Sequence, residues 1–314
     1  MDPSDINNQT IMTEFILKGL TDILQFEFLF FVLFLFIYIV ALTGNSLTGA
    51  AVSLNSELHT PMYFFLANLA FLDVICTYTD VSNLLQILGR KDNTISFRGC
   101  MTQLYFLTWS VAAELLVFTA MAYAWYVAIC QPLHYSKKMS REVCISLAVA
   151  VWGISAFGAT TNTSLLLRLS FCGPIVIDHY LCEIPALLPL SCSSTCVNDI
   201  MTVVADIFFA VLNFLLTMLF YSFITFSIMA IRTTEGKKRA FSTCSSHLIV
   251  VTMYYSTVIY VYLSSGSSYS PNKGQIMAVL YSTVSPTLNP VIYTLKDKDV
   301  KRALRKLFMF LKGK

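Results

Sequence analysis

Long apolar segments alternate with short polar connections along almost the whole chain. A helix needs about 20 apolar residues to cross the hydrocarbon of a bilayer. Seven segments reach this length, at roughly 26–52, 61–88, 100–130, 143–166, 199–231, 241–264 and 274–295. A closed barrel would instead show a series of short alternating strands, which this pattern lacks. The pattern therefore predicts an all-α membrane protein, a seven-transmembrane helix bundle whose backbone satisfies its own hydrogen bonds.

A shorter periodic segment follows the seventh apolar stretch. Apolar residues recur there at helical spacing, with basic residues on the opposite face; the apolar ones are Val300, Ala303, Leu304, Leu307, Phe308 and Leu311. This spacing predicts a short amphipathic eighth helix that lies on the inner leaflet of the membrane. A solvated basic tail is the alternative interpretation.

The composition agrees with a membrane protein and shows no division into domains. The chain is 56% hydrophobic and 12% charged, whereas soluble domains have about 25% charged residues. No linker rich in Pro, Gly or Ser interrupts it, and no internal repeat appears, which argues against a transporter built from two related halves. We expect one domain over 1–314, with an N-terminal segment (1–25), the helix bundle (26–295) and a C-terminal tail (296–314).

The basic residues predict the orientation of the bundle. Of the 21 Lys and Arg, 15 lie near 137–141, near 232–239 and after 295, so the N-terminus is expected outside and the C-terminus in the cytosol. Residues 1–25 lack a basic region before an apolar core, which predicts an uncleaved first helix rather than a signal peptide. Asn8 begins a glycosylation triplet on the outer side, whereas the triplet at Asn162 falls inside a predicted helix.

The nine cysteines sort by their predicted depth. Five lie on the outer side, namely Cys100, Cys172, Cys182, Cys192 and Cys196. They permit two disulfides with one thiol left over, and their spacing alone leaves the pairing open. The other four lie within a helix or near the reducing cytosol.

Five motifs occur in order at the expected depths. They are Gly-Asn at 44–45, Pro-Met-Tyr-Phe-Phe-Leu at 61–66, Met-Ala-Tyr-Ala-Trp-Tyr-Val-Ala-Ile-Cys at 121–130, Ala-Phe-Ser-Thr-Cys-Ser-Ser-His-Leu at 240–248 and Pro-Thr-Leu-Asn-Pro-Val-Ile-Tyr at 286–293. With these motifs the chain resembles, along essentially its whole length, the tetrapod-type odorant (olfactory) receptor family of rhodopsin-like G-protein-coupled receptors.

The resemblance implies a plasma-membrane receptor that binds a small volatile odorant in the outer half of the bundle. It further implies a heterotrimeric stimulatory G protein that raises cyclic AMP, with membrane lipid as the other partner. The implied disulfides are Cys100–Cys182 and Cys172–Cys192, which leaves Cys196 unpaired. We expect no enzyme, because the sequence has no metal-ligand set, nucleotide-binding glycine motif or Ser-His-Asp array. A non-signalling orphan membrane receptor and a transporter or channel are the alternatives.

The chain departs from the family pattern at 124–125, where Ala and Trp replace the usual Asp and Arg. In rhodopsin-like receptors this Arg holds the inactive state through its acidic neighbour and reaches towards the G protein on activation. Trp has one N–H donor and no charge, so we expect a weaker latch and weaker coupling. An anchor at the membrane interface is the alternative role. The coupling residues implied by the resemblance are Ala124, Trp125, Tyr126, Tyr221 and Tyr293.

Polar residues inside the predicted helices are costly in a bilayer and mark function by default. The resemblance implies a polar switch, with a possible sodium ion, formed by Asn45, Asp73, Glu114 and Asn289. Hard cations such as sodium prefer oxygen ligands. The alternative is a protonated, hydrogen-bonded carboxyl pair without a metal. No other cofactor is expected.

A small-molecule pocket is concave and mostly apolar, with a few placed polar groups. Helical spacing and analogy to the family place its ligand contacts at Leu104, Thr108, Val111, Ala112, Asp206, Phe209, Tyr255, Ile259, Tyr262, Val279 and Ser282. Asp206, and Asp80 in the second segment, are either counterions for a cationic odorant or carboxylates reached by water. The set predicts a compact, largely apolar ligand with one or two polar atoms.

Overall fold

The structure is a computed structural model that describes residues 14–19, 24–90, 93–172, 176–231, 233–263, 271–296 and 298–311. Asn8, the predicted glycosylation site, lies outside these ranges. Within these ranges, some side chains are not described, including those of Tyr262 and Tyr293.

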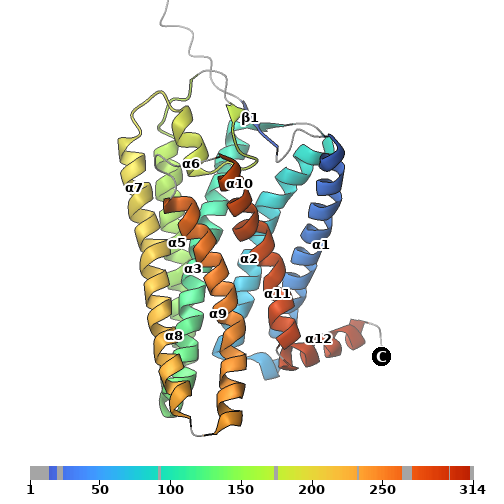
Figure 1. Ribbon diagram of the computed structural model, residues 1–314, viewed down its shortest axis with the longest axis vertical. Coiled ribbons are helices and arrows are strands. Elements are labelled where there is room, and N and C mark those ends of the chain that lie inside the picture. Colours follow the sequence, from blue (N-terminus) through green and yellow to red (C-terminus); the bar gives the residue numbers. More distant parts are fainter. Residues whose placement is uncertain are drawn as a thin grey trace, which may run out of the picture.

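Long, nearly parallel helices form the body of the molecule (Figure 1). They are α1 (Leu24–Leu54), α2 (Pro61–Arg90), α3 (Phe97–Cys130), α5 (Arg141–Leu166), the continuous run α7 (Cys196–Asp206), η5 (Ile207–Leu212) and α8 (Asn213–Ala230), α9 (Thr234–Leu263), and the run α10 (Pro271–Val279), η6 (Leu280–Val284) and α11 (Ser285–Lys296). Short helical segments lie in the connections: η2 (Ser56–Leu58), η3 (Pro132–His134), α4 (Tyr135–Lys138), α6 (Ile184–Leu187) and η4 (Leu188–Leu190). All seven predicted segments fall on these long runs, so the predicted all-α fold is confirmed.

The helical runs differ in length and hydropathy. Among the described residues, five helical runs are long and apolar enough to cross a membrane: Phe26–Leu54, Pro61–Gly89, Phe97–Cys130, Arg141–Leu166 and Cys196–Ala230. In α9 the apolar stretch is shorter, His247–Tyr260, because its first turns carry charged residues. The last span is divided by the π-helix η6 and contains Pro290 within α11.

Local sequence explains where the central helices begin. The Ser96 side chain accepts a hydrogen bond from Gly99 N (3.1 Å), which caps the first turn of α3. Ser140 does the same for Val143 N (3.4 Å), so α5 begins before its apolar segment does. Pro61 occupies the first position of α2, where its missing N–H costs nothing.

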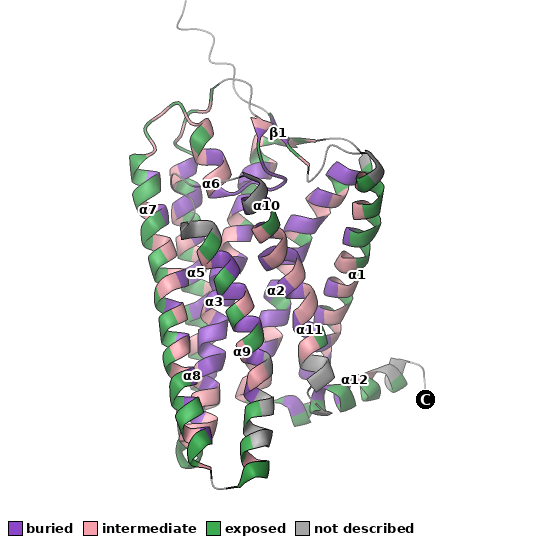
Figure 2. Ribbon diagram, viewed as in Figure 1, coloured by how far each residue is buried: buried purple, intermediate pink, exposed green. Residues whose placement is uncertain are grey.

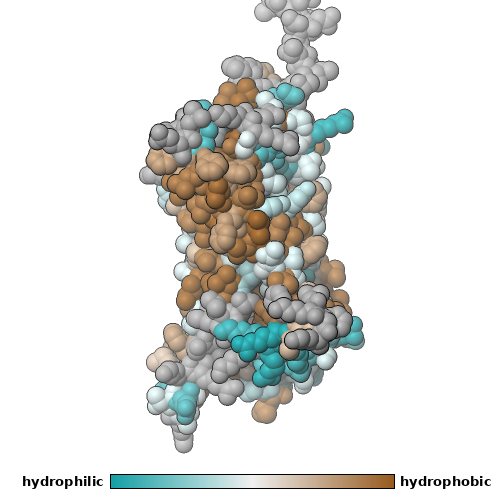
Figure 3. All heavy atoms as spheres, turned by 90° about the vertical axis from the view of Figure 1, so that its right-hand side faces the viewer, coloured by the Kyte–Doolittle hydropathy of each residue, from teal (hydrophilic) through white to brown (hydrophobic). Residues whose placement is uncertain are grey.

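The buried residues face the centre of the bundle and concentrate on α3, while exposed residues face outwards (Figure 2). The outward residues include large apolar side chains such as Phe28 and Phe36, which are 74% and 66% exposed. On the face in Figure 3, apolar side chains cover the middle of the molecule and hydrophilic ones gather around α12. Exposed apolar surface of this extent is typical of helices that face hydrocarbon rather than water.

A small sheet that the sequence analysis did not predict lies at one end of the bundle, called here the sheet end. It consists of β1 (Glu14–Leu17), β2 (Thr94–Ser96) and β3 (Val176–Ile177), in the order β2-β1-β3. The strand β1 pairs antiparallel with β2 and parallel with β3. The buried Phe15 stacks on Phe97 and meets Phe171 edge-on. Such short strands show no periodicity of their own, and their partners are distant in sequence.

The amphipathic helix α12 (Lys298–Leu311) lies across the other end, the α12 end (Figure 1). Ala303 packs in a cluster with Ala51, Val52 and Leu58, which joins α12 to α1 and η2. On its polar side, Lys306 Nζ lies 2.9 Å from Glu57 Oε1. The hydrogen bond and charge of Lys306 hold the pKa of the Glu57 carboxyl below its ordinary value.

Candidate functional site

A cavity lies between α3, α5, α6, the α7–η5 junction and α9, in the half of the bundle nearer the sheet end. It offers about 40 Å³ to the centre of a water-sized sphere, enough for a few waters or a compact ligand. Five predicted contacts line it, namely Thr108, Val111, Ala112, Asp206 and Phe209. The residues that the sequence analysis missed are Leu115, Gly158, Ala159, Asn162, Ile184, Thr202, Ala205, Ala210 and Val258.

Five other predicted contacts do not line this cavity. Leu104 is buried in the core, and the Tyr255 hydroxyl donates to Leu115 O at 2.9 Å, which keeps it within the bundle. Ile259 packs against the core. Val279 and Ser282 lie on α10 and η6, which do not border the cavity. The Tyr262 side chain lies outside the described residues, so its role stays a prediction.

The helix α5 forms a wall of the cavity where the sequence analysis placed the seventh span. Small residues of α5 allow this close approach. A Cβ added to Gly158 would lie 2.9 Å from Phe209 Cε2, so the ring occupies the space that only glycine leaves free. Ala159 and Asn162 continue this wall. The Gly-Ala pair was visible in the sequence, but small residues are common at helix contacts in membranes and do not by themselves indicate a pocket.

The π-helix η5 begins directly after Asp206, which ends α7. Wide π turns are frequent at functional sites, because they re-aim the side chains on either side. Here Asp206 and Phe209 both face the cavity. The side-chain amide of Asn213, at the far end of η5, donates a hydrogen bond to Phe208 O at 2.8 Å.

A segment at 178–184, called here the roof and buried from His179 onwards, covers the cavity from the sheet end and contributes Ile184 to its lining. The disulfide Cys100–Cys182 fastens the roof to α3, and Cys172–Cys192 closes the neighbouring part of the connection. These are the two pairs that the resemblance implied. Cys196 is an exposed free thiol.

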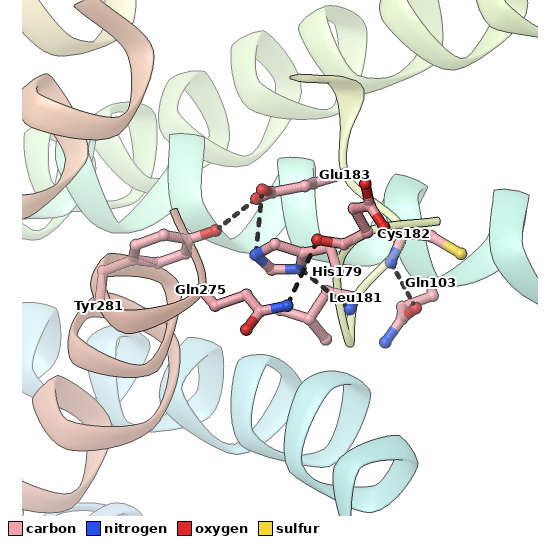
Figure 4. Close-up of polar contacts among 8 residues, drawn as sticks. Gln103, His179, Leu181, Cys182, Glu183, Gln275 and Tyr281 are labelled. Carbon is pink, nitrogen blue, oxygen red and sulfur yellow. Dashed lines mark hydrogen bonds and ion pairs between the residues drawn. The ribbon is translucent and has the colours of Figure 1, made fainter. Parts of the chain in front are cut away.

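Polar contacts tie the roof to three helical runs (Figure 4). Gln103 of α3 accepts from Cys182 N at 3.0 Å and donates to Thr79 O of α2 at 3.2 Å. On the other side, Gln275 of α10 donates to Asp178 O at 3.3 Å. The roof is therefore held between α2, α3 and α10.

A histidine, a carboxylate and a tyrosine form the centre of this network (Figure 4). His179 Nε2 lies 3.3 Å from Glu183 Oε1, and the Tyr281 hydroxyl of η6 donates to Glu183 Oε2 at 3.3 Å. Burial first, and then the charge of Asp80, raises the pKa of the neighbouring Tyr180 hydroxyl. The sequence analysis did not predict this arrangement.

The predicted polar switch is partly assembled. Asn289 Nδ2 donates to both oxygens of Asp73, at 3.1 and 2.9 Å, and Asn45 Nδ2 donates to Pro286 O at 2.8 Å. Glu114 is fully buried near Asp73, and its carboxyl oxygens have no hydrogen-bond partner among the described residues. The space between Asn45, Asp73 and Asn289 does not admit the centre of a water-sized sphere. Sodium binding at this position stays a prediction.

Comparison with known proteins agrees with the geometry. A family model described as olfactory receptor matches residues 34–311. The chain belongs to the olfactory receptor family. Olfactory receptor 13A1 of Homo sapiens is 52% identical over 311 residues, 99% of this chain and 95% of that protein. Olfactory receptor 13G1 of Homo sapiens is 48% identical, over 97% and 99% of the two chains, and olfactory receptor 5AR1 of Mus musculus is 42% identical, over 96% and 98%.

Membership makes this olfactory receptor a multi-pass plasma-membrane G-protein-coupled receptor and not an enzyme. Its seven-helix bundle, its odorant class of ligand and its G-protein class of partner follow from the family. The particular odorant, the site that it occupies and the particular G protein do not follow from membership.

The departure from the family pattern lies at the α12 end of this receptor. Ala124 is buried, and the half-buried Trp125 packs against a cluster that contains Tyr221 and Cys244, between α3, α8 and α9. The Trp125 indole N–H is buried without a hydrogen-bond partner in the described part of the chain. The Tyr221 hydroxyl is hydrogen-bonded to His247 Nδ1 of α9, a partner that the sequence analysis missed.

Tyr126 packs on the same cluster as Trp125. The Tyr126 hydroxyl accepts a hydrogen bond from Gln131 Nε2 at 2.8 Å, which fixes it at the end of α3. The Tyr293 side chain lies outside the described residues.

Proposed function

We propose that this olfactory receptor binds a compact odorant in the cavity beneath the roof and signals through a stimulatory G protein that raises cyclic AMP. The observation that carries the proposal is the cavity itself, which is mostly apolar, has few polar groups and is covered by a fastened segment. Small-molecule sites have this character.

We also propose that the sheet end faces outwards and the α12 end faces the cytosol. The basic residues support this orientation, because Lys137, Lys138, Lys237 and the basic residues of α12 lie at the same end of the bundle. The two disulfides lie at the sheet end, as an oxidising outer compartment favours. The basic face of α12 then meets the lipid headgroups of the inner leaflet.

Coupling in this receptor is proposed to be weaker than the family pattern would give. The departure lies at the seam between α3, α8 and α9, at the α12 end. At this seam Trp125 offers apolar packing and one N–H in place of an Arg, and Ala124 offers no side-chain acceptor. The same observation favours a second candidate function, a receptor that binds its odorant and does not signal.

Cyclic AMP in cells that express the unchanged chain or the Ala124→Asp, Trp125→Arg double variant tests both candidates. Surface amounts are matched with an N-terminal tag, and a broad odorant panel is applied. A weaker response from the unchanged chain supports reduced coupling, and a response from the double variant alone supports the second candidate. Equal responses would show that the charge pair is dispensable here. The absence of any response from both would contradict the stimulatory coupling.

A further inference from the structure

The lining of the cavity is electrically one-sided. Asp206 is the single charged residue among the described lining residues, and none of them is Lys, Arg or His. The other polar groups, on Thr108, Asn162 and Thr202, are neutral. An anionic ligand would meet a carboxylate and no cation, so the cavity disfavours acids.

The Asp206 carboxylate also lacks a partner within the described chain, where no hydrogen bond or ion pair reaches it. Two buried carboxylates elsewhere do have partners, since Asp73 accepts from Asn289 and Glu183 pairs with His179. A charge in an apolar, membrane-embedded site is costly unless an opposite charge compensates it. The protein supplies no such charge at this position, which leaves the ligand to supply it.

We propose that the cavity selects small aliphatic amines, and that Asp206 is the counterion of the protonated amino group. This inference rests on the proposed function of the cavity and names the ligand class that it takes. An alkyl ammonium ion remains protonated at neutral pH, as a Lys side chain does. Its charge pairs with Asp206 while its alkyl part replaces water against the apolar lining.

Neighbouring acceptors suit the remaining ammonium hydrogens. An ammonium group has three donors and no acceptor. Asn162 uses its amide nitrogen on Gly158 O at 3.2 Å, which leaves its oxygen as an acceptor. Thr202 lies one helical turn before Asp206, so its hydroxyl shares that face of α7. Asn162 and Thr202 thus add two acceptors to the lining that contains Asp206.

The size of the cavity limits the alkyl part. Ile184 closes it from the roof, and Phe209 fills the space over Gly158. The free space of about 40 Å³ suits a branched chain of a few carbons rather than a long one. Isobutylamine, isobutanol and isobutyric acid therefore make a matched set of probes, which differ mainly in the polar group.

The experiment measures thermal unfolding of the purified full-length receptor against the concentration of each probe. Binding is read from stabilisation without any G protein, so the Ala124-Trp125 departure does not interfere. We expect isobutylamine to bind at least about 10-fold more tightly than the other two. In Asp206→Asn the amine should lose about 30-fold or more in affinity, while Asp206→Glu retains more of it. The control Asp199→Asn, an exposed acid of the same helix that lies off the cavity, should bind the amine as the unchanged chain does.

Equal binding of isobutanol and isobutylamine, or unchanged amine binding in Asp206→Asn, would overturn the inference. If Asp206→Asn does not fold, the ranking of the three probes on the unchanged receptor still decides. Gly158→Ala separates this failure from that of the proposed function. If Gly158→Ala weakens the binding of other odorants, those odorants still occupy the cavity. If neither Gly158→Ala nor Asp206→Asn changes the binding of any odorant, the odorant site lies elsewhere.

Discussion

Replacement of Gly158 by alanine tests most directly whether the cavity holds the odorant. The new Cβ would lie 2.9 and 3.0 Å from two carbons of the Phe209 ring, against ordinary contacts of 3.4 Å or more. The ring must therefore withdraw by about 0.5 Å, and it lines the cavity that it would narrow. Overpacking of a closed core costs about 1–3 kcal/mol. Since the ring borders open space, we expect about 1 kcal/mol of lost stability, at the low end of that range.

The effect on ligand binding should exceed the effect on the fold. A tenfold loss of affinity corresponds to about 1.4 kcal/mol, and we expect at least that loss for any ligand that fills the cavity. The assay compares odorant dose–response curves at matched surface amounts with thermal unfolding of the same variants. Gly153→Ala is the control, because it lies on the same helix and its added Cβ meets nothing within 4 Å. If Gly158→Ala and Gly153→Ala give the same potency for every active odorant, the cavity is not the odorant site.

Two further predictions concern the frame of the receptor. Gly44→Ala should destabilise the bundle by about 1–3 kcal/mol, because the added Cβ lies 2.9 Å from Pro290 Cγ where α1 meets α11; Gly49→Ala, with nothing within 4 Å, should leave the melting temperature and surface amount unchanged. Equal melting temperatures for the two variants would refute this explanation. At the α12 end, Lys306 lowers the pKa of the Glu57 carboxyl below its ordinary value of 4.5. The ion pair therefore contributes its full stability above pH 4.5. That stability is lost as the pH falls through the lower pKa of the folded state. Spin labels on η2 and α12 should report a distance that broadens below pH 4.5 in the unchanged chain and is broad throughout in Glu57→Gln; a distance that is independent of pH in both would contradict it.

The bundle was predictable from the sequence because each span carries its own information. A run of about 20 apolar residues can satisfy its backbone only as a helix, whatever its neighbours are. The ends of the helices needed more, since Ser140 starts α5 through a side-chain cap that hydropathy does not register. The small sheet at the sheet end of the bundle could not be predicted, because β1 has four residues and depends on partners far along the chain.

The cavity was half predictable for a similar reason. Helical spacing placed Thr108, Val111 and Asp206 on helix faces that line the cavity, because each lies on a periodic helix. The wall from α5 depends on which helices touch, and the roof depends on tertiary contacts of an irregular segment. Neither leaves a periodic pattern in the sequence. The pairing of Glu183 with Tyr281 likewise joins residues 98 positions apart.

The central position of β1 in its sheet has a consequence for the order in which the receptor is assembled. Leu17 pairs with Ile177, so roughly 160 residues are synthesised after β1 before its second partner exists. At about 5–20 residues per second, the edge of this strand that faces β3 waits on the order of 10–30 s for its partner, whereas β2 on the other edge is made earlier. The strand β1 is thus synthesised before either of its partner strands and reaches its final place only after both exist.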